Sequence, residues 1–262
     1  MAETQVVFNA ADVYERYMGQ WSRAVGENFL VWLAPPKNLR WLDLGCGTGA
    51  LTDLIQKHCA PAAVTGVDPA AAQIEYAKAR FPTAEFRVGD SMALPFDGSQ
   101  FDVVASALVL HFIPDRQKAF AEMRRVARPG GIVSGYTWER SATSKGAPYV
   151  PMMNGLRSIG VEPSTSPTVP EANLEGLRDS LERAGFSDID VTTIEAVHGY
   201  RDFDEYWAVQ TMTFHPVGKS VAALDETQRS KLRDVMRKAL PPDGNGRVSY
   251  KVRAVAFKAS AP

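Results

Sequence analysis

The sequence has few cysteines and no long apolar run, and its first residues lack the pattern expected of an export signal. Cys46 and Cys59 are its two cysteines among 262 residues, too few for a disulfide framework and without the CxxC or Cys/His spacing of a zinc site. No stretch approaches the roughly 18 consecutive apolar residues of a membrane span, and the N-terminus lacks a basic start followed by an apolar core. We therefore expect a cytoplasmic protein with no structural metal and no membrane span.

An excess of charge of one sign is also missing. The 29 Lys and Arg residues are balanced by 30 Asp and Glu, for a formal net charge of −1. Proteins that follow a phosphate backbone usually carry a basic patch, so nucleic acid is not an expected partner. With 45 % hydrophobic residues, a chain of this length can bury one large core. We expect one domain over residues 1–262, as a monomer or homodimer.

Short apolar runs alternate with helical stretches through the first half of the chain. Strands separated by helices of this length are typical of βαβ units, which build a parallel sheet covered on both faces. The expected fold class is therefore α/β, a doubly wound, Rossmann-like sheet. The predicted strands cover residues 39–44, 63–67, 84–88, 101–107 and 132–137, and the predicted helices 50–58, 70–80 and 116–127.

The two ends of the chain have a different character. Residues 10–33 repeat apolar side chains at intervals of three and four, which predicts a helical lead-in that ends before Pro35-Pro36. The Ser/Thr/Pro-rich residues 139–172 are interpreted as an irregular insertion. After them we expect a helix over 174–184, a strand over 189–197, helical segments over 204–214 and 226–240 interrupted by Pro216, and a last strand over 247–258.

The stretch WLDLGCGTG places three glycines where a buried strand turns into a helix. Glycines permit a tight turn and close approach of a ligand to the main chain, and the helix start favours an anionic group. The spacing is GxGxG rather than the GxGxxG of dinucleotide sites. Asp43, two residues before Gly45, would repel a pyrophosphate. A zwitterion, with an ammonium near Asp43 and a carboxylate near the helix, satisfies both features.

Two further acids follow the next two predicted strands. Asp68 ends the second strand, where a carboxylate can accept both hydroxyls of a ribose. Asp90 ends the third and is suited to an exocyclic amine, with Met92 or Leu94 against a flat ring. Because ligands of open α/β sheets bind outside the carboxyl ends of the strands, these residues together indicate a ligand with an amino-acid end, a ribose and an adenine.

These motifs occur in one order with VGDSMALPFDGSQFDVVASALVLHFIPD and MRRVARPGGIV. Over roughly residues 39–137 the chain resembles the class I S-adenosylmethionine-dependent methyltransferases, specifically the small-molecule type 11 group that includes ubiquinone/menaquinone-type C-methyltransferases. The resemblance implies S-adenosylmethionine as cofactor, S-adenosylhomocysteine as product, and seven strands, parallel except for a C-terminal hairpin. It also implies contacts to the cofactor: Asp43, Gly45, Cys46 and Gly47 to the methionine part, Asp68 and Pro69 to the ribose, Asp90, Ser91 and Met92 to the adenine, and Ala107 and Leu108 beside the reactive methyl.

The lead-in motif YERYMGQWSR resembles a segment that covers the cofactor in the same family. By this resemblance Tyr14 and Met18 are cofactor contacts, with Trp21, Ser22 and Arg23 as further candidates. The alternative is a helix that only docks its aromatic side chains on the core. The domain is accordingly divided into a lid over 1–36, a cofactor core over 37–138 and acceptor insertions over 139–172 and 199–246.

A sulfonium methyl is already activated, so the enzyme needs chiefly to align the acceptor and exclude water. A general base helps when the acceptor carries a proton. His111 in LVLHFIPD is the best-placed candidate, with packing as the alternative role. His198 and His215 could reach a substrate, and His58 is expected on the surface.

The two acceptor insertions are rich in aromatic and thioether side chains, which favours an apolar or aromatic small molecule methylated at O, N or C. Alternatively, these rings only fix a cap to the sheet. A module that binds the cofactor without turnover, an RNA methyltransferase and a nucleotide-dependent oxidoreductase also stay open as alternatives. The side chains are Tyr149, Met152, Met153, Tyr200, Phe203, Tyr206, Trp207, Met212 and Phe214.

Overall fold

The computed structural model describes residues 19–140, 146–164, 168–213 and 215–262. Its first half alternates strands and helices as expected. Helix α2 (Gln20–Leu33) leads in, and Tyr14 and Met18 lie outside the described residues. The elements that follow are β1 (Arg40–Leu44), α3 (Ala50–His58), β2 (Ala63–Asp68), α4 (Ala71–Arg80), β3 (Glu85–Val88), β4 (Phe101–Ala107), the 3-10 turn η2 (Leu110–Phe112), α5 (Arg116–Val126) and β5 (Ala127–Trp138).

The second half adds a hairpin and a group of helices. Its elements are α6 (Val150–Ser158), η3 (Pro170–Ala172), α7 (Leu174–Arg183), β6 (Ser187–Tyr200), α8 (Phe203–Gln210), α9 (Pro216–Ala222), α10 (Glu226–Ala239) and β7 (Val248–Ser260). No helix among the described residues is long and apolar enough to cross a membrane.

Seven strands form one sheet in the order β3-β2-β1-β4-β5-β7-β6. The first five run parallel, and β7 runs antiparallel to both β5 and β6. This confirms the expected Rossmann-like sheet with an antiparallel C-terminal hairpin. Because the parallel strands share one direction, their carboxyl ends meet at one edge, where ligands of such sheets bind.

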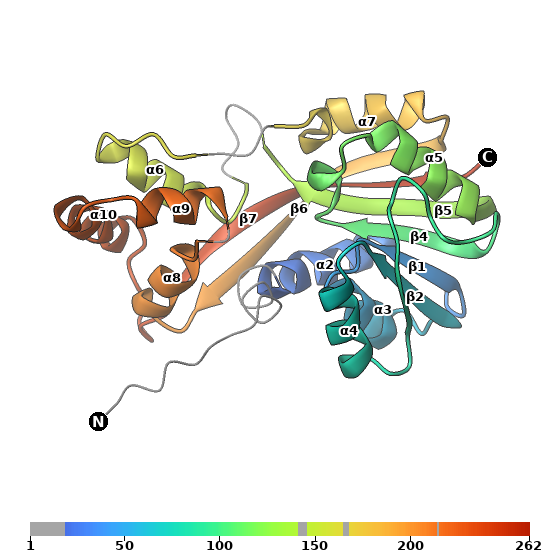
Figure 1. Ribbon diagram of the computed structural model, residues 1–262, viewed down its shortest axis with the longest axis horizontal. Helices are drawn as coiled ribbons and strands as arrows, with labels where there is room; N and C mark the ends of the chain where they lie inside the picture. Colours follow the sequence, from blue (N-terminus) through green and yellow to red (C-terminus); the bar gives the residue numbers. More distant parts are fainter. Residues whose placement is uncertain (1–18, 141–145, 165–167, 214) are drawn as a thin grey trace.

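Side chains alternate between the two faces of the sheet, as the pleat requires. Trp41 and Val103 belong to a core cluster with residues of α2 and α3, whereas Leu42 and Val104 belong to a second cluster with residues of α5 and α7. These two pairs of helices lie on opposite faces of the sheet (Figure 1). These side chains are fully buried, so both faces have an apolar core. The core holds the loops at the carboxyl edge in fixed positions.

The hairpin of β6 and β7 is longer than β5. The last pair between β5 and β7 is Trp138 with Ala254, but β7 continues beside β6 as far as the pair Val248 with Tyr200. Since β7 is antiparallel to β5, this overhang extends past the carboxyl edge of the parallel strands. Helices α6, α8, α9 and α10 gather around it as a cap (Figure 1).

Proline explains two corrections in the cap. The expected irregular insertion contains α6, in which Pro151 occupies the first turn, and Pro216 begins α9 instead of interrupting a helix. The first helical turn has no intrahelical partner for its N–H groups, so proline is favourable there. The strand expected over residues 189–197 is also longer, covering Ser187–Tyr200.

Aromatic residues of α2, the hairpin and the cap pack against one another. Trp21 of α2 lies with its ring centroid 5.0 Å from that of Tyr250, and Tyr200 lies 5.3 Å from Tyr206. Trp21, Tyr200 and Tyr206 are at most 2 % exposed. These three rings thus form part of a core that joins α2 and the cap to the hairpin. Phe214, another of the expected aromatic residues, lies outside the described residues.

Candidate functional site

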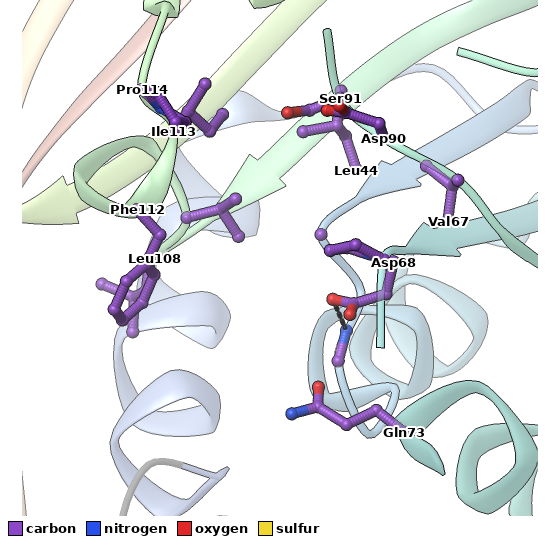
Figure 2. A pocket seen from close by; sticks show the side chains of 15 residues that line it. Leu44, Val67, Asp68, Gln73, Asp90, Ser91, Leu108, Phe112, Ile113 and Pro114 are labelled. Atoms are coloured by element: carbon purple, nitrogen blue, oxygen red, sulfur yellow. Dashed lines mark hydrogen bonds between the residues drawn. The ribbon is translucent and has the colours of Figure 1, made fainter. Parts of the chain in front are cut away.

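A pocket of about 460 Å³ opens at the carboxyl ends of β1, β2, β3 and β4 (Figure 2). Concave sites with a few convergent polar groups are the usual place for small-molecule binding. Polar groups come from the β1, β2 and β3 ends, and apolar ones chiefly from the segment after β4. The lining residues are Leu44, Gly45, Gly47, Val67, Asp68, Pro69, Gln73, Gly89, Asp90, Ser91, Leu108, Val109, Phe112, Ile113 and Pro114.

The floor of the pocket is the glycine turn between β1 and α3. Gly45, Gly47 and Gly49 have φ angles of 72°, 54° and 88°, in the left-handed region that favours glycine. A Cβ on Gly45 would also collide with the side chain of Val109. The sequence therefore needs glycine here for both backbone conformation and space, and the turn exposes main chain to the pocket.

Asp68 connects the end of β2 to this turn. Its Oδ2 accepts a hydrogen bond from the Gly47 N–H at 3.0 Å (Figure 2), and its Oδ1 accepts one from the Ala70 N–H at 2.9 Å. Burial raises the pKa of this carboxyl, and the two N–H donors act in the opposite direction. A carboxylate oxygen has a second acceptor site, so Asp68 can still accept hydroxyl groups from a ligand in the pocket.

Asp43 lies below the turn, fully buried, and does not line the pocket. Its Oδ2 accepts a hydrogen bond from Thr52 Oγ1 at 2.7 Å, whereas its Oδ1 has no hydrogen-bond partner. Burial raises the pKa of Asp43 to about 7, against the lowering effect of Thr52. A buried carboxylate oxygen without a hydrogen-bond partner is energetically costly. Asp43 therefore fits a site in which a bound ligand supplies a positively charged group, either directly or through a water molecule.

The end of β3 contributes Asp90 and Ser91. Asp90 is exposed, and its Oδ1 accepts a hydrogen bond from the Met92 N–H at 2.8 Å, which closes a tight turn. Both Asp90 and Ser91 line the pocket, while Met92 packs against the apolar core of the α5 face. The acid at this strand end therefore points into the pocket as expected, and Met92 does not.

The opposite wall is apolar. Leu108 has a φ of 59°, rare for a non-glycine residue, and its N–H donates to the Tyr136 carbonyl at 2.8 Å. Phe112 is 68 % exposed although it lines the pocket. Figure 2 shows Leu108 and Phe112 on one side of the pocket, with Asp68 and Gln73 across from them. Strained and exposed apolar residues of this kind often mark ligand sites.

The structure brings together most of the expected cofactor contacts. Asp43, Cys46, Met92 and Ala107 do not line the pocket. Cys46 is buried against α4, and burial together with the charges of Asp43 and Asp68 raises the pKa of its thiol. The expected residues that line the pocket are Gly45, Gly47, Asp68, Pro69, Asp90, Ser91 and Leu108.

The sequence interpretation missed Gln73 and Phe112. Gln73 lines the pocket from the first turn of α4, five positions after Asp68, and its closeness in sequence to that strand end could have indicated it. Phe112 directly follows His111, but an apolar residue in such a run is more often expected in the core.

The four histidines differ in their surroundings. The His111 Nδ1 lies 3.4 Å from Thr137 Oγ1, and burial, reinforced by the charge of Arg140, lowers the pKa of this imidazole to about 4. His215 caps α9, since its Nδ1 accepts the Gly218 N–H at 3.1 Å. His198 packs on Trp21 with ring centroids 4.8 Å apart, and His58 is exposed as expected. Among the four, His111 is next in sequence to a pocket residue, Phe112.

The family model of a methyltransferase domain matches residues 42–134, which include most of β1, all of β2 to β4 and every residue that lines the pocket. Residues 42–134 are a class I S-adenosylmethionine-dependent methyltransferase domain of the type 11 group. A solved structure of a methyltransferase-like protein from Bacillus halodurans superposes with a TM-score of 0.57 at 16 % identity, covering 89 % of this chain and 97 % of that one. At this identity the superposition supports the methyltransferase fold alone.

Two curated relatives show how the similarity is distributed. A trans-aconitate 2-methyltransferase of Deinococcus radiodurans is 26 % identical over 84 % of this chain and 86 % of its own length. A 2-methyl-6-phytyl-1,4-hydroquinone methyltransferase of Synechocystis is 31 % identical over 61 % of this chain, but the match spans only 50 % of that relative. The methyltransferase domain is thus shared with enzymes whose names give very different acceptors.

Proposed function

We propose that the chain transfers a methyl group from S-adenosylmethionine to a small, apolar or aromatic metabolite at O, N or C. The observation that carries the proposal is the pocket, in which acids from the ends of β2 and β3 face an apolar wall across a bare glycine turn. A zwitterionic nucleoside needs both kinds of surface. S-adenosylmethionine, when bound, supplies an activated methyl group.

The residues present fit this cofactor. In our proposal Asp68 accepts the ribose hydroxyls, assisted by Gln73, and Asp90 with Ser91 receives the adenine amine. The N–H groups of the glycine turn and the buried charge of Asp43 hold the amino-acid end. Leu108 and Phe112 cover the reactive end and exclude water. Tyr14 and Met18, outside the described residues, remain candidates for the lid.

Positioning and exclusion of water are the chain's main contributions to the chemistry. Leu108 is fixed by its hydrogen bond to Tyr136, so the apolar wall keeps a defined shape. His111 is our candidate general base for an acceptor that carries a proton. Its pKa of about 4 leaves the imidazole neutral at pH 7 and able to accept one, although as a weak base.

The acceptor is proposed to lie between the cofactor core (residues 37–138) and the insertions at 139–172 and 199–246. Support comes from the overhang of the hairpin, which brings the cap past the carboxyl edge of the sheet. The quinone methyltransferase relatives favour an apolar aromatic acceptor, whereas the relative matched over most of its length is named for an acidic one, trans-aconitate. Both of this chain's cysteines are buried and free, which supports a reducing, cytoplasmic location.

Cofactor binding can be tested first and turnover second. S-adenosylhomocysteine is expected to raise the melting temperature, and NAD is not, because only a ligand that binds the native state stabilises it. Transfer of a labelled methyl from the cofactor to a metabolite panel then separates an enzyme from a module that only binds. Tight binding to a tRNA pool at physiological salt would instead favour an RNA methyltransferase.

A further inference from the structure

The loop between β3 and β4, which brings two polar side chains to the pocket, is held in place by α5. Glu122 and Arg125 of α5 form an ion pair, with Arg125 Nε 2.7 Å from Glu122 Oε1. The other oxygen, Glu122 Oε2, accepts a hydrogen bond from the Leu94 N–H at 2.7 Å. Arg125 donates from Nη2 to the Leu94 carbonyl at 3.1 Å and from Nη1 to the Phe96 carbonyl at 2.7 Å. We call this ion pair the loop clamp, because it binds three main-chain groups of the loop.

The clamped segment packs directly against the turn that lines the pocket. Pro95, in the middle of this segment, lies so close to Gly89 that a Cβ on the glycine would be 2.8 Å from the proline Cδ. The next residue, Asp90, accepts the Ala93 N–H at its carbonyl at 3.0 Å and the Met92 N–H at its Oδ1 at 2.8 Å. The Asp90 carboxylate is thus fixed between a tightly packed glycine and a turn whose following residue is clamped.

The loop clamp is itself partly exposed. The side chains of Glu122 and Arg125 are 18 % and 39 % exposed. Hydrogen bonds from Arg125 lower the pKa of Glu122, so the pair is ionised at pH 7. Ion pairs near the surface contribute little to the stability of the whole protein, whereas charge-assisted hydrogen bonds define the position of the groups that they join. The geometry therefore favours a local role for the loop clamp, in placing the loop.

Placement decides what the Asp90 carboxylate can recognise in a purine base. Adenine has an amino group at position 6, whereas hypoxanthine has a carbonyl oxygen there and a proton on the neighbouring ring nitrogen. An ionised carboxylate only accepts hydrogen bonds, so a fixed Asp90 pairs with the adenine amine and repels the hypoxanthine oxygen. A carboxylate on a loose loop can shift to the ring N–H of hypoxanthine. Discrimination therefore requires that the carboxylate be held in place.

We propose that Glu122 and Arg125 are positioning residues that give the cofactor site its preference for adenine over hypoxanthine by fixing Asp90. This inference rests on the proposed function, in which Asp90 receives the adenine amine. Neither residue of the loop clamp lines the pocket. Loss of the clamp should therefore weaken binding of the adenine compound and leave binding of its hypoxanthine counterpart nearly unchanged.

Calorimetry with two product analogues measures the preference. The wild-type protein is titrated with S-adenosylhomocysteine and with S-inosylhomocysteine, in which hypoxanthine replaces adenine. We expect the adenine compound to bind about tenfold more tightly, as for one hydrogen bond to a charged group. Equal binding of both compounds would overturn the base preference and leave the cofactor assignment intact. Binding of neither would overturn the proposed function as well.

A matched pair of variants tests the loop clamp. Arg125→Met removes the donors and keeps most of the side chain, so it should weaken S-adenosylhomocysteine binding about tenfold and S-inosylhomocysteine binding less than about twofold. Arg128→Met is the control, because Arg128 is 45 % exposed and pairs with Asp102 at 2.7 Å, at the amino end of β4. Equal weakening of both compounds in Arg125→Met, an unchanged preference, or the same loss in Arg128→Met would contradict the proposal.

A double-mutant cycle tests whether the loop clamp acts through Asp90. Asp90→Ala is expected to abolish the preference, and adding Arg125→Met should lower it no further, since the carboxylate that the clamp positions is gone. Glu122→Leu breaks the clamp from its other side and should behave as Arg125→Met does. A further loss of preference in the double variant, or a wild-type preference in Glu122→Leu, would overturn the assignment.

Discussion

The carboxylate of Asp68 at the end of β2 accepts a hydrogen bond from the main-chain N–H of Gly47, 3.0 Å away in the turn after β1. This hydrogen bond joins the carboxyl end of β2 to the turn after β1. The Asp68 carboxylate that makes it also lines the pocket. Because Asp68 is held by two main-chain donors, its position does not depend on the ligand. This arrangement gives the site its preorganised shape.

Replacing Asp68 tests its place in the cofactor site. Asp68→Ala is expected to weaken binding of S-adenosylhomocysteine by about 1–3 kcal/mol, because the ribose hydroxyls lose their acceptor. Isothermal titration calorimetry measures the loss. Asp190→Asn is the matched control, since Asp190 lies on the edge strand β6, paired with Lys258. Equal affinities of Asp68→Ala and the wild type would place the ribose elsewhere.

Asp43 should make the protein without cofactor less stable as the pH rises. Its folded pKa of about 7 lies above the ordinary value of 3.8, so between these two pH values the native state holds a proton that the unfolded chain releases. The stability that this proton contributes is present below about pH 4 and is lost as the pH rises toward 7, at roughly 1.4 kcal/mol per pH unit. Asp43→Asn removes this dependence, so its free energy of unfolding relative to wild type should increase between pH 4 and 7.

Urea unfolding at several pH values measures that difference, and a difference that stays constant from pH 4 to 8 would contradict the account. The same variant should bind S-adenosylhomocysteine more weakly, since the charge opposite the ammonium is gone. Asp43→Asn would then be more stable without ligand and less functional, a common trade at binding sites. Unchanged affinity would limit Asp43 to a structural role.

Gly45 should tolerate no side chain. Gly45→Ala combines a φ of 72° with a collision against Val109, so it should cost about 2–4 kcal/mol of stability, affinity or both. Gly130→Ala is the control, because Gly130 has a φ of 69° but nothing within 4 Å of a new Cβ. Thermal unfolding with and without S-adenosylhomocysteine compares them. Similar losses in both variants would mean that backbone conformation alone demands glycine at Gly45.

His111→Ala separates base catalysis from packing. Affinity for S-adenosylhomocysteine should stay within about twofold, because His111 does not line the pocket, and kcat should fall less than about tenfold if the acceptor atom carries no proton. Steady-state kinetics beside the surface control His58→Ala provide the comparison. A fall of about 10²–10⁴-fold in kcat would assign His111 as general base.

The sequence predicts the methyltransferase core well because its elements alternate strongly. The strand over Phe101–Ala107 and the helix over Ala50–His58 agree with the expected bounds, since each is a continuous apolar or helical run ended by turn residues. The cap was harder. Pro151 and Pro216 resemble helix breakers in sequence, yet each stands in the first turn of a helix, a distinction that depends on where the preceding segment ends.

Some features of the candidate site could likewise be predicted from the sequence and others could not. Asp68 and Asp90 could be found because each acid follows a predicted strand. The inward direction of Cys46 and the burial of Asp43 could not, because these depend on how α3 and α4 pack over the turn. The contact between His111 Nδ1 and Thr137 Oγ1 could not be predicted either, because it depends on η2 and β5 meeting in space, and local periodicity carries no signal for such a contact.

A crystal structure with S-adenosylhomocysteine tests the central claim most directly. We predict density for the ribose within hydrogen-bond distance of the Asp68 carboxylate, for the adenine beside Asp90 and Ser91, and for the sulfur beside Leu108. Density for the nucleoside at any other surface, with this pocket filled only by water, would contradict the account.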